Sequence, residues 1–323
     1  MRATVFCSWI LFATLFVSLR ASPSVAQSTK ELLASGHVDE AIQTLQQQIS
    51  HSAADAESQN LLCRAYYMIE EWDRGIAACE GARDLDPKNG LYELWLGRVY
   101  GEKADHAGFL SASGLARKVR TSFERAVALD PNSWQARTDL AEFYVEAPAI
   151  MGGGKEKARQ EADALMPLNP GRAHWVLGRI AEKKKDMDAA EREYRSAIPA
   201  SHDGVRARFD LASFLRRSNR LDAMEEVLGQ LESAPIDHPE SLLDGANMLL
   251  KTDRNLPLAV RLVRRYFAHG PVEEGPAFKG HDLLGQLLEK QGDRRTAAEE
   301  YRAALSLFHA YGRAAENLKR VEH

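Results

Sequence analysis

The sequence predicts an all-α solenoid built from antiparallel pairs of helices, and three observations support this prediction. Pairs of a large and a small residue recur along the chain, and the steps from Cys63 to Gly97, from Gly178 to Ala212 and from Ala212 to Ala246 are each 34 residues long. A period of this length is typical of a repeat of two helices. Two of the units also share one internal spacing of small and aromatic residues. Finally, 45% of the 323 residues are hydrophobic and 27% are charged, which is enough apolar material for a folded core.

The first 26 residues have the features of a secretory signal peptide. Arg2 gives the segment a positive start, an uncharged apolar run extends from Val5 to Val17, and small residues end at Ala26. The alternative is a retained membrane anchor, but the uncharged stretch of 17 residues from Ala3 to Leu19 is at the lower limit for a helix that spans a bilayer. We therefore expect export, cleavage near Ala26, and a periplasmic or secreted mature protein that is not inserted in a membrane.

The charge and the chemistry-bearing residues argue against several classes of function. Without Arg2 and Arg20 of the leader, 40 basic residues remain against 46 acidic ones, a net charge of −6 that argues against nucleic-acid binding. The three cysteines form no CxxC pair, and the ten histidines have no spacing typical of metal ligands. No serine lies in a GxSxG motif. We expect no metal, no cofactor and no catalysis; an enzyme without a recognisable motif is the alternative.

The repeating unit places small residues where two helices would cross. In two units a glycine is followed after 12 residues by alanine, after 16 by tyrosine and after 19 by alanine. This spacing occurs at Gly178, Ala190, Tyr194 and Ala197, and again at Gly285, Ala297, Tyr301 and Ala304. Small side chains let helix backbones approach closely, and we expect the tyrosine to fill the space against the next unit.

The segments SFERAVALDPNS (122–133), AAEREYRSAI (189–198) and AAEEYRAALSLF (297–308) resemble the tetratricopeptide repeat, of the type found in exported bacterial proteins. The resemblance extends over residues 27–310, in about seven to eight units. It implies a right-handed superhelical solenoid with a concave surface that binds peptides or protein segments. The units within 205–272 are more degenerate, and their register is open.

Further features mark the ends of the predicted helices. Pro87, Pro131 and Pro170 fall where second helices of the repeat would end, because proline has no backbone N–H and a fixed φ. Residues 311–323 are expected to form a terminal capping helix with Ala314 among its apolar residues, since the last unit of an array would otherwise expose its stacking surface.

Two insertions interrupt the repeat between the first and the second helix of their units. Ten extra residues lie within 102–118 and five within 146–157. Equivalent turns of a solenoid stack on one edge, so the two segments are expected to be neighbours. They form either a docking edge or a packed extension of the helices. The apolar contacts of a docking edge would be Phe109, Leu110, Ile150 and Met151.

The run Gly152 to Lys155 is not a phosphate-binding loop. Glu156 stands where a serine or threonine would bind Mg²⁺, and Ala149 stands where the first glycine belongs. Three consecutive glycines are expected instead to allow a sharp left-handed turn into a helix that starts near Lys155.

The concave surface implied by the resemblance is basic and aromatic when the first helices are projected by helical spacing. The residues expected to point inward and to contact a partner are Asn60, Arg64, Tyr67, Leu94, Arg98, Trp175, Arg179, Phe209, Ser213 and Arg216. Arginine binds carboxylates and phosphates with two parallel hydrogen bonds, so these residues favour a protein or peptide partner that is acidic. The alternative is that the arginines pair with acidic neighbours such as Glu142 and Glu182.

Cys63 and Cys79 are expected on facing helices of one pair. In an exported protein they could form a disulfide, or remain free buried thiols, and the sequence leaves both open.

The function predicted from these observations is a non-catalytic protein-interaction scaffold in the cell envelope. The alternative is a structural or assembly component of an envelope complex or homo-oligomer that acts through its loop edge.

Overall fold

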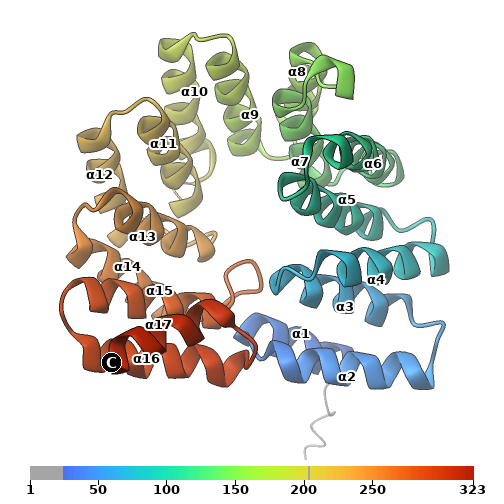
Figure 1. Ribbon diagram of the computed structural model, residues 1–323. Helices are drawn as coiled ribbons and strands as arrows, with labels where there is room; N and C mark the ends of the chain where they lie inside the picture. Colours follow the sequence, from blue (N-terminus) through green and yellow to red (C-terminus); the bar gives the residue numbers. More distant parts are fainter. Residues whose placement is uncertain (1–24, 203) are drawn as a thin grey trace, which may run out of the picture.

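A computed structural model describes residues 25–202 and 204–323, and these residues form 17 α-helices and two short 3₁₀ helices. The first sixteen α-helices make eight antiparallel pairs (Figure 1). The first helices are α1 (Val25–Ser35), α3 (Ala56–Met68), α5 (Gly90–Asp105), α7 (Trp134–Glu146), α9 (Pro170–Lys183), α11 (Val205–Arg217), α13 (Glu240–Thr252) and α15 (Ala277–Lys290). The second helices are α2 (Val38–His51), α4 (Trp72–Leu85), α6 (Phe109–Leu129), α8 (Lys155–Leu165), α10 (Met187–Ala200), α12 (Leu221–Gly229), α14 (Leu256–His269) and α16 (Arg294–Leu307). The predicted all-α solenoid is confirmed.

The predicted leader lies almost entirely outside the described residues. Within 25–202 and 204–323, no helix has the length and apolar character needed to cross a membrane. A further helix, α17 (Gly312–Glu322), follows the eighth pair and packs on α16 and α15. The degenerate region from 205 to 272 also folds as two helix pairs, α11 with α12 and α13 with α14.

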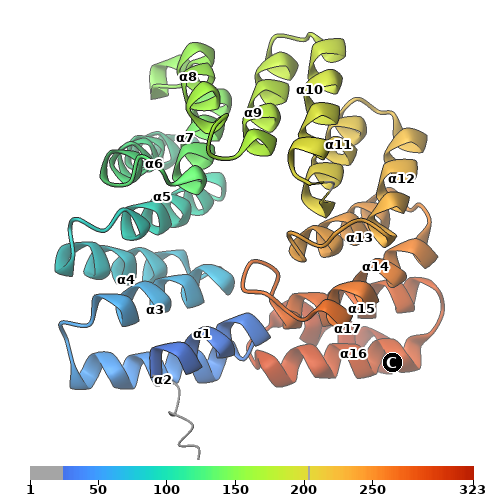
Figure 2. The same cartoon turned by 180° about the vertical axis from the view of Figure 1, so that it is seen from behind.

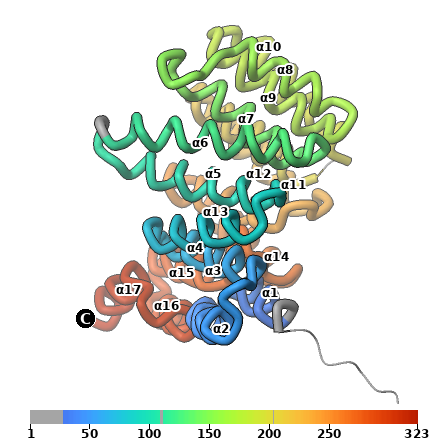
Figure 3. The backbone as a smooth tube through the Cα atoms, turned by 90° about the vertical axis from the view of Figure 1, so that its right-hand side faces the viewer, coloured from blue at the N-terminus to red at the C-terminus, as the bar shows by residue number. Residues whose placement is uncertain are grey.

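The pairs follow one another around a central space until the two ends of the array meet (Figures 1 and 2). Figure 3 shows α2 and α16 side by side. His309, just after α16, contacts Asp39 of α2 through both its backbone N–H and its Nδ1, each 2.8 Å from Oδ2. The concave groove predicted from the sequence is therefore closed into a ring.

A close backbone approach supports the ring closure. Gly36 has a φ of +83° in the turn between α1 and α2, and a Cβ built on it would lie 3.0 Å from the backbone N of Ala277 at the start of α15. Glycine suits this position twice, because it adopts a positive φ without strain and leaves room for the neighbouring chain.

Within the pairs, aromatic rings cover the predicted small residues. Cβ atoms built on Gly178 and Gly285 would lie 3.1 Å and 2.5 Å from the rings of Tyr194 and Tyr301. Tyr194 also packs against Phe214 of the next pair, with ring centroids 5.1 Å apart. Tyr194 therefore contacts the next pair as expected. Both tyrosine rings also fill space within their own helix pair, against Gly178 and Gly285.

The two insertions adopt different structures. The first lengthens α5 and α6 to 16 and 21 residues, joined by a short turn. The second forms a 3₁₀ helix, η1 (Ala149–Met151), and a turn in which Gly152 has a φ of +94° before α8 begins at Lys155. Helix α6 contacts η1, and Arg120 Nη1 lies 3.5 Å from the carbonyl oxygen of Met151, so the second insertion packs against α6 just beyond the end of the first insertion.

Candidate functional site

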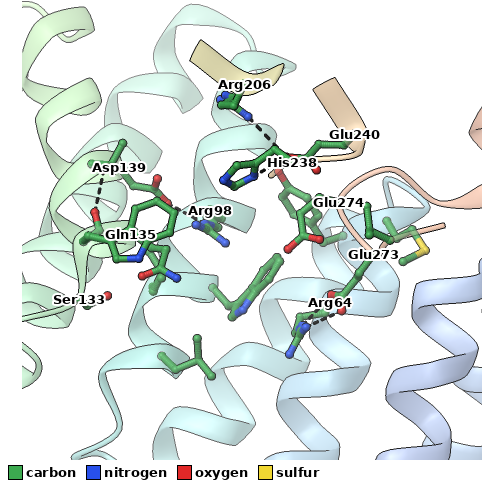
Figure 4. A pocket seen from close by; sticks show the side chains of 18 of the residues that line it. Arg64, Arg98, Ser133, Gln135, Asp139, Arg206, His238, Glu240, Glu273 and Glu274 are labelled. Atoms are coloured by element: carbon green, nitrogen blue, oxygen red, sulfur yellow. Dashed lines mark hydrogen bonds and ion pairs between the residues drawn. The ribbon is translucent and has the colours of Figure 1, made fainter. Parts of the chain in front are cut away.

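A cavity of about 800 Å³ lies at the centre of the ring (Figure 4). Its lining residues come from the first helices and from three connecting segments, those before α7, before α13 and before α15. The helices α5, α7, α9, α11, α13 and α15 all contribute residues from their first turns. Helix N-termini carry partial positive charge, so their convergence favours negatively charged groups in the cavity.

Trp95 of α5 forms the aromatic floor of this cavity. The guanidinium carbons of Arg64 and Arg98 lie 5.0 Å and 4.8 Å from the centre of its ring. Tyr67 packs edge-on against Trp95 at a centroid distance of 5.5 Å. We name these four residues the arginine–tryptophan clamp. It joins cations to a flat apolar surface, which is a combination enriched at the energetic centres of protein interfaces.

Each arginine of the clamp also holds a carboxylate. Arg98 Nε donates to Asp139 Oδ2 over 2.6 Å, and Arg64 Nε donates to Glu273 Oε1 over 2.6 Å. Burial raises the pKa of Tyr67, whose hydroxyl donates to Glu102. The clamp is thus held in place by partners from α7 and from the segment before α15.

A second charged cluster lies on the other side of the ring. Arg172 Nη1 donates to Asp210 Oδ2 over 2.8 Å, and Arg206 Nε is 3.5 Å from Asp210 Oδ1. The side chains of Arg172 and Asp210 are only 11% and 7% exposed, and burial lowers the pKa of Arg172. Desolvation together with nearby carboxylates raises the pKa of Asp244 to about 6.

Two connecting segments project into the ring. His238, before α13, packs perpendicular to Trp134 of α7, with centroids 6.5 Å apart. A hydrogen bond to Glu240 raises the pKa of His238. The segment between α14 and α15 carries Glu273 and Glu274 to the cavity (Figure 4). The centre of the ring is therefore partly filled by the chain itself.

Four of the ten residues predicted to contact a partner line the cavity: Arg64, Tyr67, Leu94 and Arg98. The other six do not. Asn60 is 2% exposed, because α3 is packed on several sides by α1, α2, α4 and α5, so its expected inward position is wrong. Trp175 is also buried, and Arg172 and Arg179 lie over its ring at 4.0 Å and 5.4 Å.

Arg179 pairs with Glu142, Glu146 and Glu182, in line with the alternative interpretation of the arginines. The remaining predicted contacts lie on α11 outside the cavity lining, namely the half-buried Phe209 and Ser213 and the exposed Arg216.

The predicted loop edge has an exposed apolar residue. Ile150 is 91% exposed, and Met151 is half-buried beside α6. Phe109 and Leu110 begin α6, and their side chains lie outside the described part of the structure.

The structure joins Cys63 of α3 and Cys79 of α4 in a disulfide, with 5.1 Å between the Cα atoms. The bond connects the two helices of one pair across 16 residues of sequence. A covalent link of this length removes conformational entropy from the unfolded chain.

We therefore expect loss of this disulfide to lower the free energy of unfolding by about 3 kcal/mol. Thermal unfolding of residues 27–323 with and without a phosphine reductant measures the effect. The variant with Cys63→Ala and Cys79→Ala is the control, because its melting temperature should not respond to the reductant. Equal melting temperatures for the oxidised and reduced protein would contradict a stabilising disulfide.

Several cavity residues were not predicted from the sequence, among them Trp95, Arg172, Glu273 and Glu274. A local signal exists for the first two. An aromatic and a basic residue three positions apart recur as Arg64 with Tyr67, Trp95 with Arg98 and Arg172 with Trp175. Such residues share one face of a helix. The glutamates reach the cavity through a distant segment that carries no such local signal.

The comparisons with known proteins agree with this architecture. The family model described as tetratricopeptide repeat matches residues 30–90 and 152–205. The structure is similar to that of yeast Tom70, at 14% identity over 98% of this chain and 66% of that one, with a TM-score of 0.55. Two further similar structures are those of a tetratricopeptide-repeat protein from Parabacteroides merdae and of a thermophilic one from Thermus thermophilus.

For the Parabacteroides protein the identity is 13% over 93% of this chain and 98% of that one, with a TM-score of 0.46. For the Thermus protein the identity is 16% over 59% of this chain and 98% of that one, with a TM-score of 0.49. No curated protein matches the sequence. At these identities the structural likeness concerns the fold.

Proposed function

Because this chain is a tetratricopeptide-repeat protein, we propose that it is a non-catalytic scaffold that binds a peptide or protein segment at the arginine–tryptophan clamp. The fold supports a role in protein–protein interaction. The observation that carries the proposal is the packing of Arg64 and Arg98 on the ring of Trp95, at the floor of a cavity of about 800 Å³. Such preformed anchors lose little conformational entropy on binding.

The charge at the clamp supports an acidic partner. Both arginines already bind carboxylates of this chain, which supports the proposal that the clamp would accept a carboxylate of a partner. The first turns of six helices add partial positive charge to the same cavity. A carboxylate entering this space would meet guanidinium groups and an apolar ring together.

Export to the cell envelope is part of the proposal. The leader-like first 26 residues support it, and so does the disulfide between Cys63 and Cys79, because disulfides persist in oxidising compartments. We propose a periplasmic or secreted protein that works after removal of the leader.

Replacement of Arg98 by glutamine is expected to abolish partner capture. The change removes one cation beside Trp95 and leaves Asp139 without its arginine, so an acidic segment loses an anchor and meets an unpaired carboxylate. Loss of a central anchor costs about 2 kcal/mol or more in binding free energy. The measurement is capture from a cell-envelope extract by immobilised residues 27–323, read by mass spectrometry.

Arg254→Gln provides a matched control for this experiment. Arg254 lies outside the cavity, between α13 and α14, and is paired with Asp222 and Glu225, so the same chemical change occurs away from the clamp. The Arg254 variant should capture the same proteins as the unmodified chain. Equal capture by the Arg98 variant would contradict binding at the clamp.

The exposed Ile150 supports the second candidate function, assembly through the loop edge. On that alternative, Ile150→Asp would abolish capture or self-association, while Arg98→Gln would leave both unchanged. Size-exclusion chromatography with light scattering distinguishes the two candidates, because only the edge function ties assembly to Ile150.

A further inference from the structure

The segment between α14 and α15 has the sequence Gly270-Pro-Val-Glu-Glu-Gly-Pro276 and reaches into the ring (Figure 4). It is held in a defined shape. The backbone N–H of Gly275 donates to the carbonyl of Val272 over 3.2 Å, and the buried hydroxyl of Tyr266 donates to the carbonyl of Gly275. The first bond closes a turn within the segment and the second attaches the segment to its own helix, α14, so the tip is left to contact Arg64 of α3. We call this segment the acidic loop.

The tip of the acidic loop occupies the arginine–tryptophan clamp. Glu273 receives two hydrogen bonds from Arg64, one from Nε over 2.6 Å and one from Nη2. The side chains are 18% and 12% exposed, so water screens this pair much less than it screens a surface pair. The two residues are 209 positions apart in the sequence. Glu273 thus binds Arg64 with the two-pronged geometry typical of carboxylate recognition.

The adjacent glutamate extends this contact toward the rest of the clamp. Glu274 is exposed to the cavity, and its carboxylate forms no ion pair with any residue that the structure describes. It adds to the negative potential felt by Arg98. With the acidic loop in place the cavity lining has five Lys and Arg residues against six Asp and Glu residues. Without the two glutamates the cations would be in excess.

We propose that the acidic loop is an internal occupant of the partner site, and that the partner is an extended segment with two adjacent carboxylates that binds by displacing it. This inference rests on the proposed function, and it adds the partner's chemistry and a competition that keeps the site closed until such a partner arrives. Apparent affinity falls in proportion to the fraction of molecules whose site is open, so the loop weakens the binding of any segment that competes for the clamp.

The two ends of the array are also held together by contacts that do not involve the clamp. The bond between Glu273 and Arg64 is therefore not what keeps the ring closed. Asp39 pairs with His309, and the backbone at Gly36 lies against the start of α15. Release of Glu273 from Arg64 therefore leaves these contacts in place, and the site can open without opening the ring.

The test uses residues 27–323 and a fluorescein-labelled peptide with the sequence of the loop, GPVEEGP, in an anisotropy titration. The variant E273Q/E274Q should bind this peptide about tenfold more tightly than the unmodified chain, because Arg64 is then free. D39N is the matched control, since it removes a closure contact away from the cavity, and it should bind like the unmodified chain. R64Q should bind the peptide no more tightly than the unmodified chain does, because it loses the arginine that would bind the peptide as well as the contact with Glu273. A peptide with glutamine at both glutamate positions should not bind.

Several outcomes would overturn the inference. Equal affinity of the unmodified chain and E273Q/E274Q would mean that the loop does not compete, although the clamp would still bind acidic segments. An equal gain in D39N would assign the effect to loosening of the ring. Absence of peptide binding to every variant would reject this partner chemistry. The proposed function would then be tested separately, by comparing capture from the cell-envelope extract by the Arg98→Gln variant and by the unmodified chain.

Hydrogen–deuterium exchange gives a readout that does not depend on a variant. Saturating GPVEEGP should speed exchange in residues 270–276 of the unmodified chain, because the loop leaves the clamp. Unchanged exchange in that segment with bound peptide would contradict displacement.

Discussion

Gly97→Ala is expected to destabilise the protein by about 1–3 kcal/mol, whereas Gly101→Ala is expected to stabilise it by about 0.5–1 kcal/mol. Both glycines lie in α5, one turn of helix apart. A Cβ at Gly97 would be 2.4 Å from the ring of Phe123 in α6, while a Cβ at Gly101 would meet no atom within 4 Å. The first change forces two helices apart, and the second only reduces the entropy of the unfolded chain.

Chemical unfolding of the two variants beside the unmodified protein measures both effects in one series. The opposite signs are the critical result, because helix propensity alone would make both replacements favourable. If Gly97→Ala were neutral or stabilising, the small residues of the repeat would not be required for close packing of the helix pairs.

Asp210→Ala is expected to lower the free energy of unfolding by about 3–5 kcal/mol. Asp210 is the acidic partner of two arginines, Arg172 and Arg206, and its side chain is 7% exposed. Its removal leaves Arg172 buried with no carboxylate bonded to it, and a buried unpaired charge is strongly destabilising. This is the largest effect that we expect from a single replacement in the first helices of the ring.

Glu322→Ala is the control for this prediction. Glu322 pairs with Arg302 near the end of the chain, and both side chains are about half exposed. Loss of such a pair changes stability by about 1 kcal/mol or less. Similar losses for the two variants would contradict the view that the Arg172–Asp210 pair is protected from water.

The repeat could be predicted from the sequence because its determinants are local. Gly178 and Tyr194 are 16 residues apart, and their contact follows from the spacing of one helix pair. The same holds for Cys63 and Cys79, whose facing positions were expected and whose bond the structure supplies. Helical spacing also predicted inward positions for Arg64, Tyr67, Leu94 and Arg98, and these four residues line the cavity.

The closed ring and the occupied clamp could not be predicted in the same way. Closure of the ring depends on the sum of the small rotations between successive helix pairs. No spacing of residues in the sequence indicates that sum. Glu273 meets Arg64 only because the ring closes. The inward positions expected on α9 and α11 also failed to reach the cavity lining, as with Trp175 and Phe209, because projection on an ideal helix ignores how neighbouring helices cover each face.

The central claim is that a partner binds inside the ring at the arginine–tryptophan clamp, and site-specific photo-crosslinking tests it most directly. A photoreactive amino acid at Gln135, an exposed residue of the cavity lining, should crosslink the partner in the intact cell envelope. The same amino acid at Arg195, exposed on the second helix α10, should not. A crosslink from position 195 with none from position 135 would contradict the account.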